Sequence, residues 1–467
     1  MTEKKCDLAI IGAGPGGYVA AIRAHRLGLT VLVIEKDKAG GVCGNWGCIP
    51  SKTLLNQATM FSNIPTLEKM GLKIDTSDFA YSKVQAVSRK AATKSGKGVE
   101  YLLKKNSIEL IKGSATINVP GELRISGGAD GDLKVRAKSI LIAAGSRPKE
   151  LAGFEFDEQN VLSSTGILSL KELPSSLIVL GAGAIGMEFA YLMNAFGVQV
   201  TIVEMMDHLL PLEDNDVSKV VEDEFKKQGI HFLTGVKADN LQRTKSGISI
   251  KLSSTDGKSE TLTADKILVA VGRTANTEGL GLENIGIRTE KGFIKVGDYY
   301  QTDIPGHYAI GDIIATPLLA HLASKEGETA VEHIAGHSPE PQVNLHENPS
   351  AVYTEPGIGS FGLTEEQAKT NNLNYGKYIF PYGGIGKANA IEKTEGLIKI
   401  IFDNNTHEII GAHIVGYCAT ELIHELLLAK KAELLPEDVA EMIHAHPTIS
   451  EGIMEAARGV EGWAIHI

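Results

Sequence analysis

Long apolar runs are missing from this sequence of 467 residues. No stretch reaches the roughly 18 consecutive apolar residues that a membrane-spanning helix needs, so we expect no membrane span. The first residues, Met1–Lys5, are polar and lead directly into an apolar segment, without the pattern of a signal peptide. These features predict a cytosolic protein.

Positive charge is scarcer than negative charge. Lys and Arg number 46 against 57 Asp and Glu, which leaves a formal net charge of −11. A large basic surface for nucleic acid is therefore not expected. The apolar fraction of 43% and the charged fraction of 22% are ordinary for a globular protein. A chain of this length is expected to fold as several domains.

Cysteine is rare, and only Cys43 and Cys48 lie close together among the four cysteines. A cytosolic protein is not expected to hold structural disulfides, so a close pair indicates catalysis or metal binding. No further Cys or His stands nearby at ligand spacing, so we expect no metal. Gly44 and Gly47 ease the turn that a Cys43–Cys48 disulfide requires. A helix starting just after Cys48 would raise its thiolate content. Two inert thiols are the alternative.

Glycine, by contrast, is abundant at 51 residues, and the first cluster follows an apolar segment. Residues 7–11 are typical of a buried parallel strand, and residues 18–27 of a helix. Between them Gly12, Gly14 and Gly17 form the pattern G-x-G-x-x-G, and a second strand over 30–34 ends at Glu35. We expect the glycines and the helix N-terminus to bind a pyrophosphate, and Glu35 to bind a ribose diol.

The same unit occurs a second time, which makes the interpretation much stronger than a lone fingerprint. A strand over 177–180 precedes three glycines at the same spacing, a helix extends to about residue 196, and a strand over 199–203 ends at Glu204. The glycines are Gly181, Gly183 and Gly186. Glu204 favours the 2′-hydroxyl of NAD and repels the 2′-phosphate of NADP, and no arginine follows to bind that phosphate. An ordinary charge at the end of a strand is the alternative for Glu204.

Two further acidic residues stand out. Asp312 follows a short apolar strand and Gly311, where a carboxylate can accept hydrogen bonds from a polyol. Glu188 interrupts the apolar helix over 184–196, and a charge there needs a partner or an exposed face. Lys52 is the partner we favour, and an exposed face is the alternative.

A candidate acid–base pair lies near the C-terminus. His446 can exchange a proton with a thiol near neutral pH, and Glu451 can orient it and stabilise its charged form. Taken alone, a histidine near a helix start is more often structural than catalytic, so a structural role is the alternative. Pro447 between them restricts the backbone and is a candidate for a cis peptide bond. A helix over 451–458 begins at Glu451. His444 is expected to be a bystander or a structural contact.

Taken in order, these segments resemble the pyridine nucleotide–disulfide oxidoreductases over essentially the whole chain. The residues that carry the resemblance are Gly12–Tyr18, Cys43–Lys52, Gly181–Glu188, Tyr308–Asp312, Leu319–His321 and His446–Glu451. Within that family the sequence is most similar to the dihydrolipoyl dehydrogenases. The resemblance implies an α/β fold of two Rossmann-like nucleotide-binding domains, for FAD and NAD, with a C-terminal α+β dimerisation domain. The implied boundaries are 1–146 and 273–347 for the FAD domain, 147–272 for the NAD domain, and 348–467 for the dimer interface.

The resemblance also implies roles for individual residues. Cys48 would face the flavin, Cys43 would exchange with the substrate, and Lys52 would pair with Glu188 beside the flavin. His446 and Glu451 would come from the other subunit of a homodimer. The implied FAD and NAD contacts are Gly12, Gly14, Gly17, Glu35, Lys52, Gly145, Asp312, Ala320, Gly181, Gly183, Gly186, Glu204 and Gly272.

The implied reaction is the oxidation of dihydrolipoyl groups, on a carrier protein or as free dihydrolipoamide, with reduction of NAD through the Cys43–Cys48 disulfide and FAD. The redox loop departs from the family pattern, because Gly44-Asn45-Trp46 stands where Leu-Asn-Val is usual. Trp46 could narrow access to Cys43, which makes an NADH-dependent reductase of another disulfide the main alternative.

Other rivals are less well supported by the residues. A glutathione-type reductase would prefer NADPH, against Glu204. A mercuric reductase would call for a C-terminal cysteine pair, and Trp463–Ile467 contains none. A flavin-bearing subunit of low turnover would not need the complete set of Cys43, Cys48, Lys52, His446 and Glu451.

Overall fold

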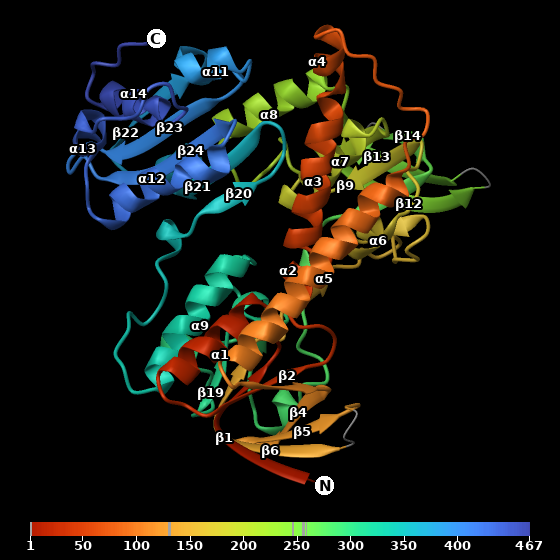
Figure 1. The fold of residues 1–467 in the computed structure, drawn as a ribbon, viewed down its shortest axis with the longest axis vertical. Coiled ribbons are helices and arrows are strands. Elements are labelled where there is room, and N and C mark those ends of the chain that lie inside the picture. The colour runs from red at the N-terminus through yellow and green to blue at the C-terminus, as the bar shows by residue number, and fades with distance from the viewer. Residues whose placement is uncertain (1, 129–131, 245–246, 255–256, 258) are drawn as a thin grey trace. The chain divides into compact units, whose positions relative to one another are not determined.

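The computed structural model of the protein describes residues 2–128, 132–244, 247–254, 257 and 259–467 (Figure 1). The chain divides into two compact units, each built from three separate segments. Unit 1 comprises Met1–Leu54, Ser82–Lys149 and Arg273–Val343. Unit 2 comprises Leu55–Tyr81, Glu150–Gly272 and Asn344–Ile467. The domain boundaries expected from the sequence remain predictions.

Unit 1 is organised around a seven-stranded sheet in the order β3-β2-β1-β6-β5-β4, with β19 also paired to β6. The strands β1, β2, β3, β6 and β19 pair in parallel, whereas β4 and β5 add an antiparallel edge. The strand bounds are β1 Thr2–Ile11, β2 Val31–Glu35, β3 Glu109–Lys112, β4 Ser114–Val119, β5 Glu122–Ser126, β6 Leu133–Ile142 and β19 His307–Ala309. Ligands of such sheets bind beyond the carboxyl ends of the parallel strands.

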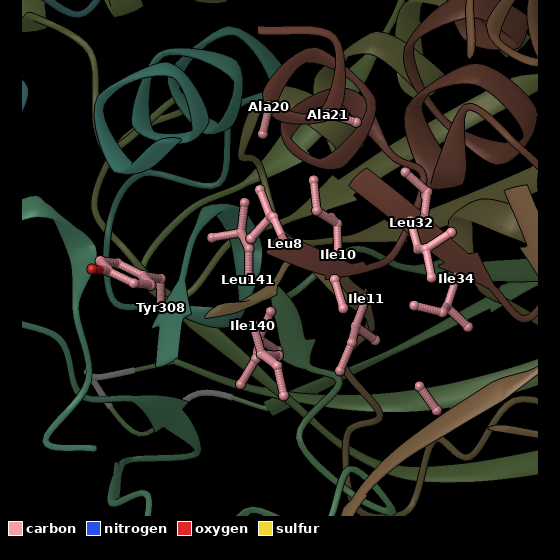
Figure 2. Close-up of a cluster of buried hydrophobic side chains, with 14 of the residues drawn as sticks. Leu8, Ile10, Ile11, Ala20, Ala21, Leu32, Ile34, Ile140, Leu141 and Tyr308 are labelled. Atoms are coloured by element: carbon pink, nitrogen blue, oxygen red, sulfur yellow. The ribbon is translucent and has the colours of Figure 1, made fainter. Parts of the chain in front are cut away.

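The core of unit 1 consists of the two faces of this sheet and the helices packed on them (Figure 2). Leu8 and Ile10 of β1, Ile34 of β2 and Ile140 of β6 are all at most 1% exposed. Continuous apolar runs of this kind are typical of parallel strands that are covered on both sides. The helices of unit 1 are α1 Pro15–Arg26, α2 Gly41–Trp46, α9 Ala320–Ile334, most of α5 Tyr81–Lys105 and the first half of α3 Cys48–Ser62.

Short elements complete unit 1. Strand β7 pairs antiparallel with β16, and β17 pairs with β18. Their bounds are β7 Ser146–Pro148, β16 Arg273–Ala275, β17 Thr289–Glu290, β18 Phe293–Ile294, and the 3-10 turns η1 Leu282–Asn284, η2 Asp298–Tyr300 and η3 Gly311–Ile313. The β7–β16 pair brings residues 146–148, which precede the second glycine-rich segment, next to residues 273–275, which follow it.

Unit 2 contains a second parallel sheet, in the order β11-β10-β9-β15-β8. The bounds are β8 Val161–Leu162, β9 Ser176–Leu180, β10 Gln199–Val203, β11 His231–Leu233 and β15 Lys266–Val269. An antiparallel meander accompanies it, formed by β12 Val236–Thr244, β13 Gly247–Ser254 and β14 Ser259–Ala264. The helices are α4 Ile64–Lys69, α6 Ser164–Ser169, α7 Ala184–Ala195 and α8 Asn215–Lys227.

The C-terminal part of unit 2 has a different architecture, with an antiparallel sheet in the order β20-β21-β24-β23-β22. Its strands are β20 Ser350–Val352, β21 Gly357–Gly362, β22 Tyr375–Pro381, β23 Leu397–Asp403 and β24 Ile409–Gly416. Its helices are α10 Glu365–Thr370, α11 Gly386–Ala390, α12 Ala419–Lys431, α13 Pro436–Glu441 and α14 Glu451–Val460, with turns η4 Leu345–Glu347 and η5 Tyr382–Gly384. The expected fold class, two Rossmann-like domains and a C-terminal α+β domain, is confirmed.

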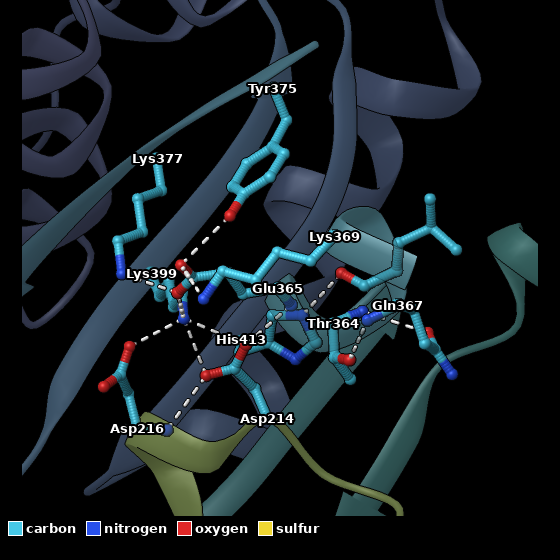
Figure 3. Close-up of polar contacts among 11 residues, drawn as sticks. Asp214, Asp216, Thr364, Glu365, Gln367, Lys369, Tyr375, Lys377, Lys399 and His413 are labelled. Atoms are coloured by element: carbon cyan, nitrogen blue, oxygen red, sulfur yellow. Dashed lines mark hydrogen bonds and ion pairs between the residues drawn. The ribbon is translucent and has the colours of Figure 1, made fainter. Parts of the chain in front are cut away.

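A buried charge cluster joins α8 to the C-terminal sheet within unit 2 (Figure 3). Lys399 of β23 is fully buried and contacts Asp214 at 2.8 Å, Asp216 at 2.6 Å and Glu365 at 2.8 Å. Burial alone would raise the pKa of Asp214, but His413, the N–H of Glu365 and Lys399 outweigh burial and hold that pKa below its usual range. Both partners are therefore charged in the folded protein.

Replacing Lys399 with methionine should lower the free energy of unfolding of unit 2 by about 3–5 kcal/mol, because it leaves the buried Asp214 carboxylate without its cation. Lys377 provides a matched control, since it pairs with Glu365 but its side chain is 39% exposed. Lys377→Met should cost about 0–1 kcal/mol. Urea unfolding of both variants measures the difference, and equal losses would show that Lys399 is not the essential cation of the cluster.

Among the described residues, no helix combines the length and the apolar character that crossing a membrane requires.

Candidate functional site

The two glycine fingerprints are built alike. Gly12 has a φ of +108°, and a Cβ there would lie 2.2 Å from the carbonyl oxygen of Ala143. A Cβ on Gly17 would lie 2.0 Å from the carbonyl oxygen of Gly12. Gly181 and Gly186 meet the same obstacles, with a Cβ 2.6 Å from Ala270 O and 1.9 Å from Gly181 O. A side chain at the first or third glycine of each fingerprint would therefore clash with the backbone, so the fold requires glycine at both positions.

The middle glycines are different, because nothing in the chain requires them. Gly14 and Gly183 are the N-caps of α1 and α7, with φ near −72° and −73° that any residue can adopt. A Cβ on Gly14 would meet no atom closer than 3.9 Å, and one on Gly183 none within 4 Å. Each middle glycine thus leaves open space at a helix N-terminus, where a pyrophosphate can approach the backbone closely.

Glu35 and Glu204, the acids at the end of β2 and after β10, accept hydrogen bonds from the two glycine-rich turns in the same way. In the first, Glu35 accepts hydrogen bonds from Ala13 N and Asp37 N, each at 2.8 Å. In the second, Glu204 accepts from Ala182 N at 2.6 Å and Met206 N at 2.8 Å. A carboxylate has about four lone-pair positions, so two acceptor positions remain for a ribose diol.

Replacing Glu204 with alanine should raise the KM for NAD by roughly 10- to 150-fold, the equivalent of about 1.5–3 kcal/mol for hydrogen bonds to a charged group. The ratio of kcat/KM for NAD over NADP should fall in parallel, because the variant also loses the repulsion of a 2′-phosphate. Steady-state kinetics with both nucleotides measure this ratio. If the two values of kcat/KM fell equally, Glu204 would support only the turn.

The candidate flavin acid Asp312 lies in η3, at the carboxyl end of β19. Its carboxylate accepts the hydroxyl of Ser146 at 2.5 Å, and Arg273 lies 3.7 Å away. Arg273 also donates to the hydroxyl and the carbonyl of Ser146. Burial lowers the pKa of Arg273, whereas Asp312 and Cys48 act in the opposite direction. The Arg273 side chain is 12% exposed, so a largely buried cation stands within electrostatic reach of both Asp312 and the redox pair.

A second acid, Glu326, forms hydrogen bonds with the turn that carries Asp312. Glu326 of α9 is fully buried and accepts hydrogen bonds from Gly311 N at 2.6 Å and Thr316 Oγ1 at 2.8 Å. Burial raises its pKa to about 7. Ser146, Arg273 and Glu326 were not among the residues expected from the sequence. Arg273 directly follows the expected cofactor residue Gly272, and Glu326 is a charge on the apolar face of a helix, so signals for both were present.

The remaining expected cofactor residues lie at turns and ends of elements. Gly145 and Gly272 both have positive φ, +68° and +117°, just before β7 and β16. Ala320 is the first residue of α9. Their contacts with a cofactor remain predictions.

The redox loop forms two helices rather than a simple turn. Cys43 lies in α2, and Cys48 is the first residue of the 15-residue helix α3, at the helix end where the backbone stabilises negative charge. Both cysteines are half-buried. The hydrogen bond of Cys43 to Cys48 and burial raise the pKa of the Cys43 thiol, and the charge of Lys52 opposes them. The two sulfurs therefore interact directly, with Lys52 close enough to act on them.

Trp46 shapes the outer side of this loop. The guanidinium of Arg89 lies 4.7 Å from the centre of the Trp46 ring, and the ammonium of Lys38 lies 5.5 Å from it. Arg89 also donates to the carbonyl of Asn45 at 2.9 Å. Gly44 permits the close approach of α5, because a Cβ there would lie 3.0 Å from the hydroxyl of Ser95. The unusual Gly44 and Trp46 thus fit together against α5.

Glu188 and Lys52 were expected to form a pair. Glu188 is only 6% exposed, so the exposed-face alternative is wrong, and its carboxylate accepts a hydrogen bond from Tyr353 N at 3.1 Å. The pairing with Lys52 remains a prediction.

The acid–base candidates are held together as expected. His446 Nδ1 lies 2.9 Å from Glu451, which also accepts from Thr448 N at 2.8 Å. Burial would raise the pKa of Glu451, but the N–H of Thr448 and His446 lower it below its usual range. The imidazole of His446 is 77% exposed, and the His446–Pro447 peptide bond is cis. His444 is 3% exposed and bonded to Glu425, which agrees with a structural contact.

Comparison with known proteins places the chain among close relatives. Residues 6–327 match the sequence model of the pyridine nucleotide-disulphide oxidoreductases, and residues 348–457 match that of their dimerisation domain. Dihydrolipoyl dehydrogenase of Bacillus subtilis is 42% identical over 98% of this chain and 99% of its own length. The enzyme of the same name from Chlorobaculum tepidum is 42% identical over 97% and 96%. The crystal structure of LpdA from Mycobacterium tuberculosis superposes with a TM-score of 0.89 at 28% identity, covering 98% of this chain and 100% of that one.

Proposed function

The chain belongs to the pyridine nucleotide-disulphide oxidoreductase family, and on that premise we propose that it oxidises dihydrolipoyl groups and reduces NAD. The observation that carries this proposal is the interacting Cys43–Cys48 pair, with Cys48 at a helix N-terminus, in a chain with two complete glycine-rich dinucleotide-binding turns. The relatives named dihydrolipoyl dehydrogenase, at 42% identity over nearly the whole chain, supply the substrate class.

The proposed thiol chemistry uses both cysteines in turn. In the oxidised protein Cys43 and Cys48 form a disulfide, and a dihydrolipoyl thiolate attacks the sulfur of Cys43. That attack breaks the disulfide, forms a mixed disulfide and releases Cys48 as a thiolate. The second dihydrolipoyl thiol then attacks the mixed disulfide, which closes the lipoyl ring and releases Cys43. The pair has gained two electrons, and the substrate has lost two electrons and two protons.

The protons need an acceptor at the thiols, and His446 is the proposed base. Its Nδ1 is held by Glu451, so Nε2 is directed outward and can accept a proton from a dihydrolipoyl thiol. The charge of Glu451 stabilises the imidazolium that forms. The imidazole is exposed, and His446 lies within the residues that match the sequence model of the dimerisation domain. We therefore propose that His446 serves the cysteine pair of a partner subunit in a homodimer.

The residues at the two glycine-rich turns fit FAD and NAD, the two cofactors of the family. Gly12, Gly14, Gly17, Glu35 and Asp312 would hold FAD, and Gly181, Gly183, Gly186 and Glu204 would hold NAD. FAD supplies a two-electron relay between thiols and nicotinamide that side chains cannot provide. The chain contributes binding, orientation and a base, and the buried cation Arg273 favours the Cys48 thiolate electrostatically. We also propose a cytosolic location, because the close pair Cys43 and Cys48 is assigned to catalysis and the sequence offers no second close pair for a structural disulfide.

A direct assay of NAD reduction by dihydrolipoamide tests this proposal. Purified protein is supplied with free dihydrolipoamide and NAD, and the formation of NADH is followed by absorbance. The same protein is tested with NADH or NADPH and glutathione disulfide. Rapid reduction of NAD by dihydrolipoamide, with little activity on glutathione, is the expected result. Turnover of another disulfide with NADH, without turnover of dihydrolipoamide, would favour the reductase alternative that Trp46 raises.

A further inference from the structure

Helix α5 is strongly basic in a chain that is otherwise acidic. At 25 residues it is the longest helix among the described residues, and it carries six lysines and Arg89 against one acid, Glu100 (Figure 1). The chain as a whole has a net charge of −11. Positive charge is thus concentrated on one element of unit 1.

The lysines of α5 share one side of the helix, which we call the α5 basic face. All six are exposed, and successive spacings of seven, four, three and seven residues place the first five in a single stripe, to which the adjacent Lys105, eight residues after Lys97, also belongs. Its members are Lys83, Lys90, Lys94, Lys97, Lys104 and Lys105. Val87 and Tyr101, 44% and 62% exposed, interrupt the stripe with apolar surface. At about 1.5 Å per residue the stripe is roughly 33 Å long, enough for a small protein domain.

These lysines are electrostatically unsatisfied. Within the described parts of the chain, none of them forms an ion pair. Other lysines of unit 1 do so, including Lys134 with Glu122 at 2.6 Å and Lys138 with Asp7 at 2.7 Å. Unpaired charges of one sign create a field that attracts and orients a partner of the opposite sign.

The other side of α5 packs on the redox loop. Ser88 donates to the carbonyl of Pro50 at 3.0 Å, and Arg89 contacts both Asn45 and Trp46. The α5 basic face therefore lies about one helix diameter, roughly 10 Å, from the loop that carries Cys43. That distance is comparable to the Debye length of about 8–10 Å at moderate salt, so the field of the lysines extends to the loop.

We propose that the α5 basic face is the docking surface for an acidic carrier domain that presents its dihydrolipoyl group to Cys43. This inference rests on the proposed function and names the kind of partner that serves it. An acidic carrier is repelled by the net negative charge of the chain and attracted where these lysines gather, which orients it beside the redox loop. Val87 and Tyr101 supply apolar contact within the same surface.

Three matched peptides test the charge requirement. Each contains one dihydrolipoyl-lysine, flanked by glutamates, glutamines or lysines. At low salt the wild-type protein should oxidise the acidic peptide with a kcat/KM roughly tenfold or more above the neutral one, and the basic peptide should be the slowest. High salt should abolish the difference, because it screens the lysines.

Two triple variants locate the effect. Lys90→Glu, Lys94→Glu and Lys97→Glu together should remove or invert the preference for the acidic peptide. The control reverses three exposed lysines of α8 with the same change in net charge, Lys219→Glu, Lys226→Glu and Lys227→Glu. It should keep most of the preference. Free dihydrolipoamide is uncharged, so both variants should oxidise it at the wild-type rate.

The outcomes separate this inference from the function on which it rests. If wild-type protein did not oxidise free dihydrolipoamide, the proposed function would fail and the docking proposal would fall with it. If dihydrolipoamide were oxidised but the α5 variant kept the wild-type preference, only the docking proposal would be overturned. Binding of phosphatidylglycerol vesicles through the same lysines, with no preference among the peptides, would overturn it in favour of a membrane surface.

Discussion

Replacing Cys48 with serine will abolish turnover of dihydrolipoamide with NAD, with a loss of kcat of about 10⁴-fold or more. A serine hydroxyl cannot form the disulfide that accepts the two electrons, and no other group of the proposed site replaces it. Residues that act as one unit show such losses individually, so Cys43→Ser should have an effect of similar size. Steady-state kinetics with dihydrolipoamide and NAD measure both variants, and the flavin absorbance verifies that FAD stays bound.

Cys418→Ser is the matched control for these variants. Cys418 is an exposed free thiol at the start of α12 in unit 2, outside the redox loop. Its replacement should leave turnover within about twofold of wild type. If Cys418→Ser were inactive, or if Cys48→Ser kept a substantial fraction of its activity, the Cys43–Cys48 pair would not be the electron acceptor.

Replacing His446 with glutamine should lower kcat for dihydrolipoamide by roughly 10²- to 10⁴-fold, the usual contribution of a positioned general base. Glutamine preserves much of the side-chain size but cannot accept the proton. Glu451→Gln should cause a smaller loss, because the imidazole stays in place while its charged form loses a carboxylate 2.9 Å away. Kinetics over a range of pH measure both effects.

His444→Gln controls for the loss of a histidine in the same segment. His444 is buried against Glu425, so this variant should lose stability but keep turnover within about threefold. A second reaction isolates the step: reduction of ferricyanide by NADH bypasses the dithiol and should survive His446→Gln. A variant that lost the ferricyanide reaction as strongly as the dithiol reaction would show that His446 supports the fold or the flavin rather than the proton transfer.

The parts of the fold that could be predicted are those with local causes. The expected strand over 199–203 coincides with β10, and the expected helix over 184–196 differs from α7 by one residue. The apolar runs, the fingerprint glycines and the terminal acids lie within one short stretch of chain, so their periodicity and spacing are sufficient. The extension of β1 back to Thr2 was missed, because the polar residues 2–5 join the sheet by pairing with β6.

The surroundings of Asp312 were missed for a different reason. Ser146, Arg273 and Asp312 come from three distant segments, and the antiparallel pairing of β7 with β16 brings the first two together. No local pattern marks such a convergence. The redox loop likewise differed from the expected turn, because Gly44 lets α5 approach and Arg89 covers Trp46, so the loop is held as helix α2.

The most direct test of the central claim is an anaerobic titration of the purified flavoprotein with dihydrolipoamide, followed by addition of NAD, with the visible spectrum recorded throughout. The account predicts a long-wavelength absorbance band from the Cys48 thiolate beside the flavin, its absence in Cys48→Ser, and its disappearance on addition of NAD with formation of NADH. A flavin spectrum that dihydrolipoamide leaves unchanged, in a protein that NADH still reduces, would contradict it.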